Sequence, residues 1–159
     1  MPLQKITKIL TPAQAFDKMC KYCAYQERTQ HQVRLKLQSL YIPNQDTENI
    51  IAKLIENNFI NELRFATTYA SGKFRINKWG KLKIKHGLKK QKITPYCIAK
   101  ALQSIDNQEY EKAAKKLFTT KYNGLKGQKK IKALKAASYL RTKGYESDII
   151  THLANVIED

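Results

Sequence analysis

The sequence predicts an all-α protein built of three tandem three-helix repeats that stack end to end. Apolar residues recur at helical spacing almost throughout the chain. Only four prolines and six glycines interrupt its 159 residues. Apolar positions also recur at a constant interval, which is typical of stacked repeats that each bury an apolar face against a neighbour.

Three anchor positions set this interval: Ile42, Ile93 and Tyr145 lie 51 and 52 residues apart. Apolar residues stand nine and five positions before each anchor, as Val33 and Leu37, Ile84 and Leu88, and Ala136 and Leu140. Another amphipathic stretch follows each anchor. Each repeat is therefore expected to contain three helices.

The first repeat is expected over residues 12–58, after an N-terminal tail over residues 1–11. Pro12 follows Thr11, and proline is common at the first position of a helix because its missing N–H would be unpaired there anyway. The apolar spacing predicts helices over residues 12–26, 29–40 and 46–57.

The second and third repeats are expected over residues 59–105 and 106–159. In the second, Asn77 and Thr94 are suitable N-caps, and the predicted helices span 61–74, 77–90 and 94–104. In the third, Gly144 is a suitable C-cap, and the predicted helices span 107–121, 126–143 and 147–157.

The charge is strongly one-sided, with a formal net charge of +17. No Asp or Glu occurs between Leu63 and Ile105, or between Lys112 and Tyr145, and these two windows with Lys112 hold 22 of the 30 basic residues. A protein that needed only solubility would mix both signs of charge. The composition therefore indicates an anionic partner: nucleic acid, an anionic membrane surface or an acidic protein face.

On a helical wheel, the predicted helix 77–90 carries a basic stripe beside its apolar edge. Four lysines fall within about 80° of arc at 100° per residue: Lys78, Lys81, Lys85 and Lys89. The predicted helix 126–143 has a similar side lined by Lys132, Lys135, Tyr139 and Lys143. Each stripe by itself could be an ordinary solvated face, but two in neighbouring repeats favour contact with an anion.

Two aromatic residues accompany these lysines. Trp79 could stack on a base or pack between repeats, and we favour packing. For Tyr139 both interpretations stay open. Arg75 and Arg141 are secondary candidates, since a guanidinium suits carboxylate or phosphate groups.

Several segments resemble the RecX family of regulatory proteins in order and spacing. Residues 59–66, then Lys73 and residues 78–84, resemble the central motif of that family. Residues 25–29 and 137–150 resemble segments on either side. The similarity extends over about residues 12–153 and all three repeats. The fold that this resemblance implies is an elongated, curved array of three-helix repeats.

The resemblance implies a cytoplasmic, non-enzymatic modulator of RecA recombinase, expected to act as a monomer. Such a protein would bind the RecA–single-stranded DNA filament, in its groove or at its growing end. It would inhibit filament extension, ATP hydrolysis, strand exchange and co-protease activity, and so modulate DNA repair and the SOS response. The sequence departs from the family at Gln91-Lys92, where Lys-Gly is common, so this turn is expected to avoid a left-handed backbone.

The resemblance and the charge pattern together define a candidate surface for the RecA–DNA filament. Its expected members are Lys78, Lys81, Lys85, Lys89, Lys132, Lys135, Lys143, Arg75, Arg141, Trp79 and Tyr139.

The alternative function is a helical repeat that binds DNA directly, without sequence specificity and with no obligatory protein partner. The two differ in whether binding needs recombinase. No cofactor, metal site, catalytic residue or membrane segment is expected. Cys20 and Cys23 have Cys-x-x-Cys spacing, but the second ligand pair of a zinc site is missing, so they are predicted to pack in or beside the core.

Overall fold

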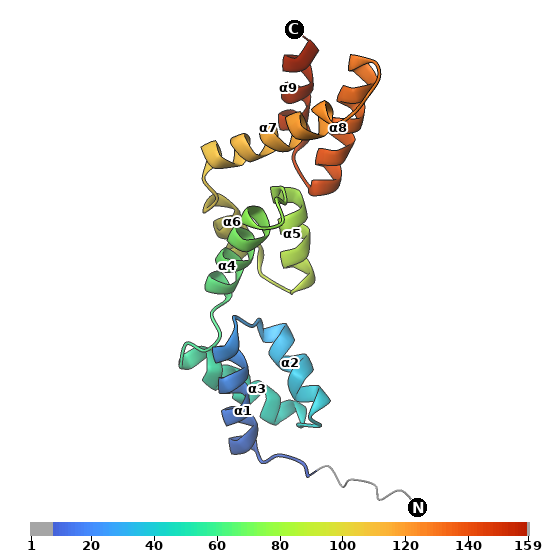
Figure 1. The fold of residues 1–159 in the computed structure, drawn as a ribbon. Coiled ribbons are helices and arrows are strands. Elements are labelled where there is room, and N and C mark those ends of the chain that lie inside the picture. The colour runs from blue at the N-terminus through green and yellow to red at the C-terminus, as the bar shows by residue number, and fades with distance from the viewer. Residues whose placement is uncertain (1–7, 159) are drawn as a thin grey trace, which may run out of the picture. The chain divides into compact units, whose positions relative to one another are not determined.

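A computed structural model describes residues 8–158, and all nine of its helices in that range are α-helices, with no strand among the described residues (Figure 1). The all-α prediction is confirmed there. The described residues divide into two compact units that meet between Phe65 and Ala66. Residues 1–7 of the predicted N-terminal tail lie outside the described residues. The predicted repeat boundaries after residues 58 and 105 stay a prediction.

The first unit contains α1 (Pro12–Tyr25), α2 (Gln30–Ser39) and α3 (Asn44–Glu56). Both α1 and α2 begin with a capping box, because the hydroxyls of Thr11 and Thr29 accept hydrogen bonds from the amides of Gln14 and Gln32. Each glutamine side chain in turn accepts from the threonine amide. These reciprocal bonds satisfy N–H groups that a helix start leaves unpaired.

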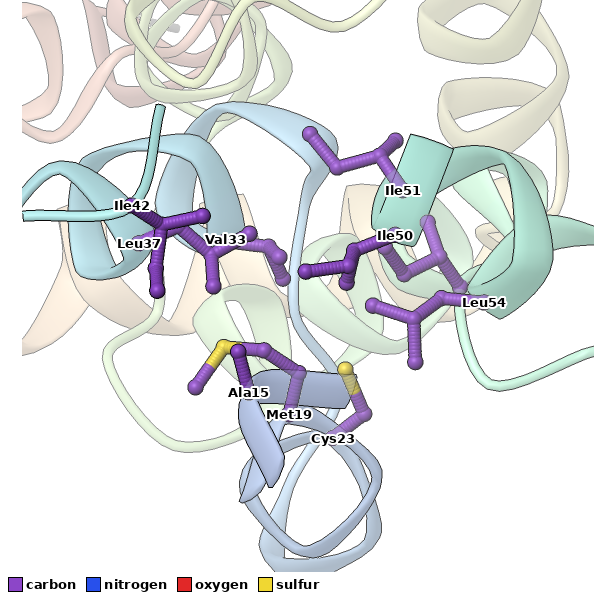
Figure 2. Packing of buried hydrophobic residues seen from close by; sticks show 10 residues of the cluster. Ala15, Met19, Cys23, Val33, Leu37, Ile42, Ile50, Ile51 and Leu54 are labelled. Carbon is purple, nitrogen blue, oxygen red and sulfur yellow. The ribbon is translucent and has the colours of Figure 1, made fainter. Parts of the chain in front are cut away.

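The core of this unit forms where the apolar faces of the three helices meet. Figure 2 shows side chains from α1, α2 and α3 converging on one another. The buried set is Ala15, Met19, Cys23, Val33, Leu37, Ile42, Ile50, Ile51, Leu54 and Ile60. Cys23 belongs to this core and Cys20 packs against it, so the packing prediction for the cysteine pair is confirmed.

The second unit holds most of α4 (Glu62–Arg75), together with α5 (Lys81–Lys90), α6 (Pro95–Gln103), α7 (Asn107–Asn123), α8 (Lys129–Lys143) and α9 (Ser147–Glu158). Helices α7, α8 and α9 pack on one another, and α5 packs on α6. Phe74, Tyr110 and Tyr145 form a row of buried rings, with centroids 5.7 and 5.2 Å apart.

The same turn precedes each of the three anchors. The residue just before each anchor has a positive φ, which is 59° at Tyr41, 62° at Lys92 and 92° at Gly144. The amide of each anchor then donates to the leucine carbonyl five residues earlier, at 3.1, 3.2 and 3.1 Å in chain order. This bond closes the helix end and turns the anchor side chain into the core, which is why anchor and leucine recur at a constant offset.

One prediction about these turns is wrong. The turn at Gln91-Lys92 does not avoid the left-handed region, because Lys92 itself adopts it. This backbone conformation costs free energy for lysine, whose Cβ is crowded there, but not for glycine, which has no Cβ. The anchoring of Ile93, which is 7% exposed, compensates for this local cost.

Candidate functional site

The basic stripe of the second repeat lies on a shorter helix than predicted. Helix α5 begins at Lys81 with Gly80 as its N-cap, so Asn77 is not the cap. Lys81, Lys85 and Lys89 are all helical and follow one flank at spacings of four residues. Lys85 and Lys89 are exposed, and Lys81 is partly buried.

Lys78 does not belong to this helical stripe, so its predicted place on the wheel is wrong. It precedes α5 and has a φ of 59°. Its carbonyl accepts a hydrogen bond of 3.0 Å from the Tyr145 hydroxyl. The chain reverses at Lys78, and a helical period cannot be extended through such a reversal.

Lys81 has a structural role as well as a charge. Its amide donates to the Tyr110 hydroxyl at 2.9 Å, and its ammonium lies 4.8 Å from the centroid of that ring. The Tyr110 hydroxyl donates to the Glu146 carboxylate at 2.7 Å. Burial raises the pKa of Tyr110, and the Glu146 charge adds to this, so the phenol stays protonated and can act as donor and acceptor together.

Trp79 lies between two lysines. The ammonium groups of Lys73 and Lys83 are 4.9 and 4.7 Å from the indole ring system. The side chain is partly buried, and its amide donates to the Lys73 carbonyl. Two ammonium groups therefore lie within cation–π distance of this ring, and whether Trp79 packs between repeats or stacks on a base stays a prediction.

In the third repeat the structure brings Tyr139 together with lysines from two helices. Lys121 of α7 and Lys143 of α8 lie 5.2 and 5.9 Å from its ring centroid. Lys132 is 4.2 Å from the centroid of Tyr122. Lys121 and Tyr122 were not among the residues predicted for the candidate surface, although their position at the end of a lysine-rich helix could have suggested them.

One of the predicted cations, Arg141, projects away from this cluster, and two others are exposed. Arg141 follows Lys132 by nine residues, which is half a turn of the wheel at 100° per residue, so it projects from the opposite side of α8. Lys135 is exposed. Arg75 is the last residue of α4 and is also exposed.

A close backbone joint connects the second and third repeats. The amide of Gly80 donates to the Lys143 carbonyl at 2.7 Å, and the amide of Leu82 donates to the Gly144 carbonyl at 2.9 Å. A Cβ added to Gly80 would lie 2.3 Å from the carbonyl carbon of Gly144. Helix α5 thus begins directly against the end of α8, where Lys83 also reaches the Thr142 carbonyl at 3.4 Å.

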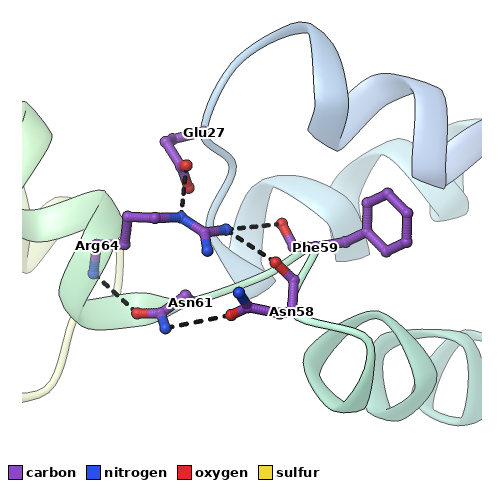
Figure 3. Close-up of polar contacts among 5 residues, drawn as sticks. All are labelled: Glu27, Asn58, Phe59, Asn61 and Arg64. Carbon is purple, nitrogen blue, oxygen red and sulfur yellow. Dashed lines mark hydrogen bonds and ion pairs between the residues drawn. The ribbon is translucent and has the colours of Figure 1, made fainter.

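In the first unit, Arg64 forms an ion pair with Glu27 at 2.6 Å (Figure 3). Its guanidinium also donates to the Asn58 carbonyl at 3.0 Å, and its amide donates to the Asn61 side chain. The two residues are 37 positions apart and belong to two of the segments that resemble the RecX family. This pair ties the first turn of α4 to the connection between α1 and α2 and leaves Arg64 little capacity for an external anion.

Potential metal ligands are dispersed among the described residues, and Cys23 is buried. In that part of the chain, no three His, Cys, Asp or Glu side chains are grouped closely enough to hold a metal ion. Burial raises the pKa of Cys23 to about 11, so its thiol is protonated at neutral pH. Among the same residues, no helix is both long and apolar enough to cross a bilayer.

Comparisons with known proteins agree with this architecture. Residues 15–54 match the family model for the first three-helix domain of RecX, and residues 61–102 match the model for the second. A crystal structure of RecX from Lactobacillus salivarius superposes with a TM-score of 0.85 at 26% identity, covering 92% of this chain and 96% of that one.

Relatives of known name point to the same family. The regulatory protein RecX of Clostridium acetobutylicum is 34% identical over 74% of this chain and 56% of its own length. That of Lactobacillus johnsonii is 26% identical over 92% of this chain and 55% of its own length. The chain therefore spans about half the length of these relatives, which are named as regulatory proteins rather than enzymes. From the two matched three-helix domains and the shared fold, the chain belongs to the RecX family.

Proposed function

We propose that this protein binds RecA recombinase filaments on single-stranded DNA and inhibits their extension. Reduced ATP hydrolysis, strand exchange and co-protease activity would follow, with effects on DNA repair and the SOS response. Membership of a family of regulatory proteins, combined with a lysine-lined helix flank in the second repeat, carries this proposal.

The charge distribution supports a filament as the target. A filament presents DNA phosphates and protein carboxylates along one path, and a chain with a net charge of +17 can contact both. Lys85 and Lys89 are exposed on α5 and available for such contacts. Lys78 and Lys81 contribute charge from positions that their backbone contacts hold in place.

A second candidate function is direct binding of single-stranded DNA by the third repeat. The observation that favours it is the group of Tyr122 and Tyr139 with Lys121, Lys132 and Lys143. Lysines that track phosphates beside aromatic rings are typical of surfaces that bind single strands.

ATP hydrolysis by RecA on excess single-stranded DNA tests the first candidate against the second. We expect suppression at well under one copy of this protein per RecA. Suppression only when enough protein is present to occupy the DNA would favour direct DNA binding. No effect at any ratio would refute RecA regulation.

A further inference from the structure

The corner between α4 and α5 presents an unusual apolar side chain. Ile76 is 82% exposed, more than any other large aliphatic side chain in the part of the chain that the structure describes. A single exposed aliphatic residue is ordinary on a protein surface and by itself indicates no partner. The backbone of this corner, however, is held from several directions.

Hydrogen bonds within the corner hold Ile76 at the end of α4. Its amide donates to the Gly72 carbonyl at 2.9 Å and continues the helical pattern. The Trp79 amide then returns to the Lys73 carbonyl at 3.1 Å, which closes the turn. Ile76 is thus presented on a closed turn rather than on a free loop.

Residues from the third repeat hold the same corner from outside. The Lys143 ammonium donates to the Asn77 carbonyl at 3.2 Å, and the Tyr145 hydroxyl donates to the Lys78 carbonyl at 3.0 Å. The joint at Gly80 adds a further bond of 2.7 Å. Because the position is preorganised, a partner that covers Ile76 would pay little entropy for ordering the corner.

Charge around the corner indicates what kind of partner fits. Arg75 and Lys78 are both exposed and stand on either side of Ile76 along the chain. Their segment contains no acidic residue between Leu63 and Ile105. An apolar knob between two cations is complementary to an apolar pocket with carboxylates at its rim.

We propose that Ile76 is a protein-binding knob that inserts into a carboxylate-rimmed apolar pocket on the recombinase, with Arg75 and Lys78 pairing with the rim. This rests on the proposed function, since the recombinase filament is taken as the partner. A nucleobase is a poorer occupant, because platforms that stack single-stranded bases are aromatic and isoleucine has no π face. Trp79, three residues further on, is partly buried and so offers a base less ring surface than an exposed aromatic side chain would.

The test compares three variants with the unmodified chain: Ile76→Ser, Ile76→Val and the control Leu134→Ser. Leu134 is 61% exposed on α8, so it matches the chemistry of the change on another surface. Dissociation constants are measured for RecA filaments, assembled on single-stranded DNA with a slowly hydrolysed ATP analogue, and for the same DNA alone. Circular dichroism and Trp79 emission verify that each variant is folded.

We expect Ile76→Ser to weaken filament binding by about tenfold or more, as for a buried aliphatic anchor, and to leave DNA binding unchanged. Ile76→Val should lose about fourfold, since it removes one methylene group and most of the apolar surface remains. Leu134→Ser should bind like the unmodified chain.

Three results would overturn the inference. If Ile76→Ser binds the filament as tightly as the unmodified chain does, Ile76 is not a binding knob, but the proposed function stands. Equal weakening on bare DNA would place Ile76 against nucleic acid instead of protein. If the unmodified chain does not bind the filament, the proposed function and the inference are both wrong. This result differs from the first two because binding is absent without any substitution.

Discussion

The substitution Gly80→Ala tests the joint between the second and third repeats. A Cβ at this position would lie 2.3 Å from both the carbonyl carbon and the carbonyl oxygen of Gly144 and 2.4 Å from the Tyr145 nitrogen. These are backbone atoms, so no side-chain rotation can relieve the clash. The start of α5 and the end of α8 must therefore move apart.

The expected cost follows from what this movement breaks. The two backbone hydrogen bonds of the joint, at 2.7 and 2.9 Å, are each worth about 1 kcal/mol net. Overpacking of a close contact adds about 1–3 kcal/mol. Together these lower the free energy of unfolding by roughly 3–5 kcal/mol, a large share of the ~5–15 kcal/mol typical of a domain.

Urea unfolding followed by the emission of Trp79 measures this cost. Trp79 is the only tryptophan in the sequence and directly precedes Gly80. The matched control is Gly72→Ala, because a Cβ at this helical glycine would meet nothing within 4 Å. The control should gain about 0.5–1 kcal/mol from reduced backbone entropy in the unfolded chain. A loss below about 1 kcal/mol in Gly80→Ala, or equal losses in both variants, would refute the reasoning.

Three further predictions use the same structure. Lys92→Gly should raise the free energy of unfolding by about 0.5–1 kcal/mol, since it removes the left-handed penalty but adds entropy to the unfolded chain; a urea titration that shows a loss would contradict this. Lys85→Glu should weaken filament binding several-fold and reduce by about 1 the slope of the logarithm of the binding constant against the logarithm of salt concentration. Lys90→Glu, on another flank of the same helix, should weaken binding less. Equal weakening by both variants would show that no particular flank of α5 binds the filament. Burial, with a contribution from the charge of a neighbouring glutamate, raises the pKa of Tyr145 to about 12, above the ~10 of unfolded tyrosine. The stability that its neutral hydroxyl contributes is therefore complete below pH 10 and lost between pH 10 and 12. Urea midpoints that stay constant from pH 9 to 12 would disprove this.

The helices could be predicted from the sequence because the residue patterns that indicate a helix are local. Apolar spacing predicted nine helices, and the structure has a helix at each of those places, with α1 beginning at Pro12 as expected. The recurring leucine and anchor were also visible in the sequence, since one short turn with one hydrogen bond fixes their offset. The similarity of whole segments then indicated the family.

Only part of the candidate surface could be predicted from the sequence. Lys81, Lys85 and Lys89 share a flank because helical geometry alone decides it. Lys78 was misplaced because the chain reverses there, at a corner held by Lys143 and Tyr145 from a distant segment. The apolar periodicity of residues 77–90 depends on those residues alone, so it cannot indicate contacts with Lys143 and Tyr145.

The sequence by itself determined the all-helical class, the helix positions, the repeat spacing and the one-sided charge, because each depends on residues within a few turns of one another or on composition alone. Only the tertiary structure decided which charges are available to a partner. It paired Arg64 with Glu27 across 37 residues, set Lys73 and Lys83 beside Trp79, and exposed Ile76 at a fixed corner. Such contacts join residues distant in the chain, so they depend on how helices pack rather than on the pattern within any one helix.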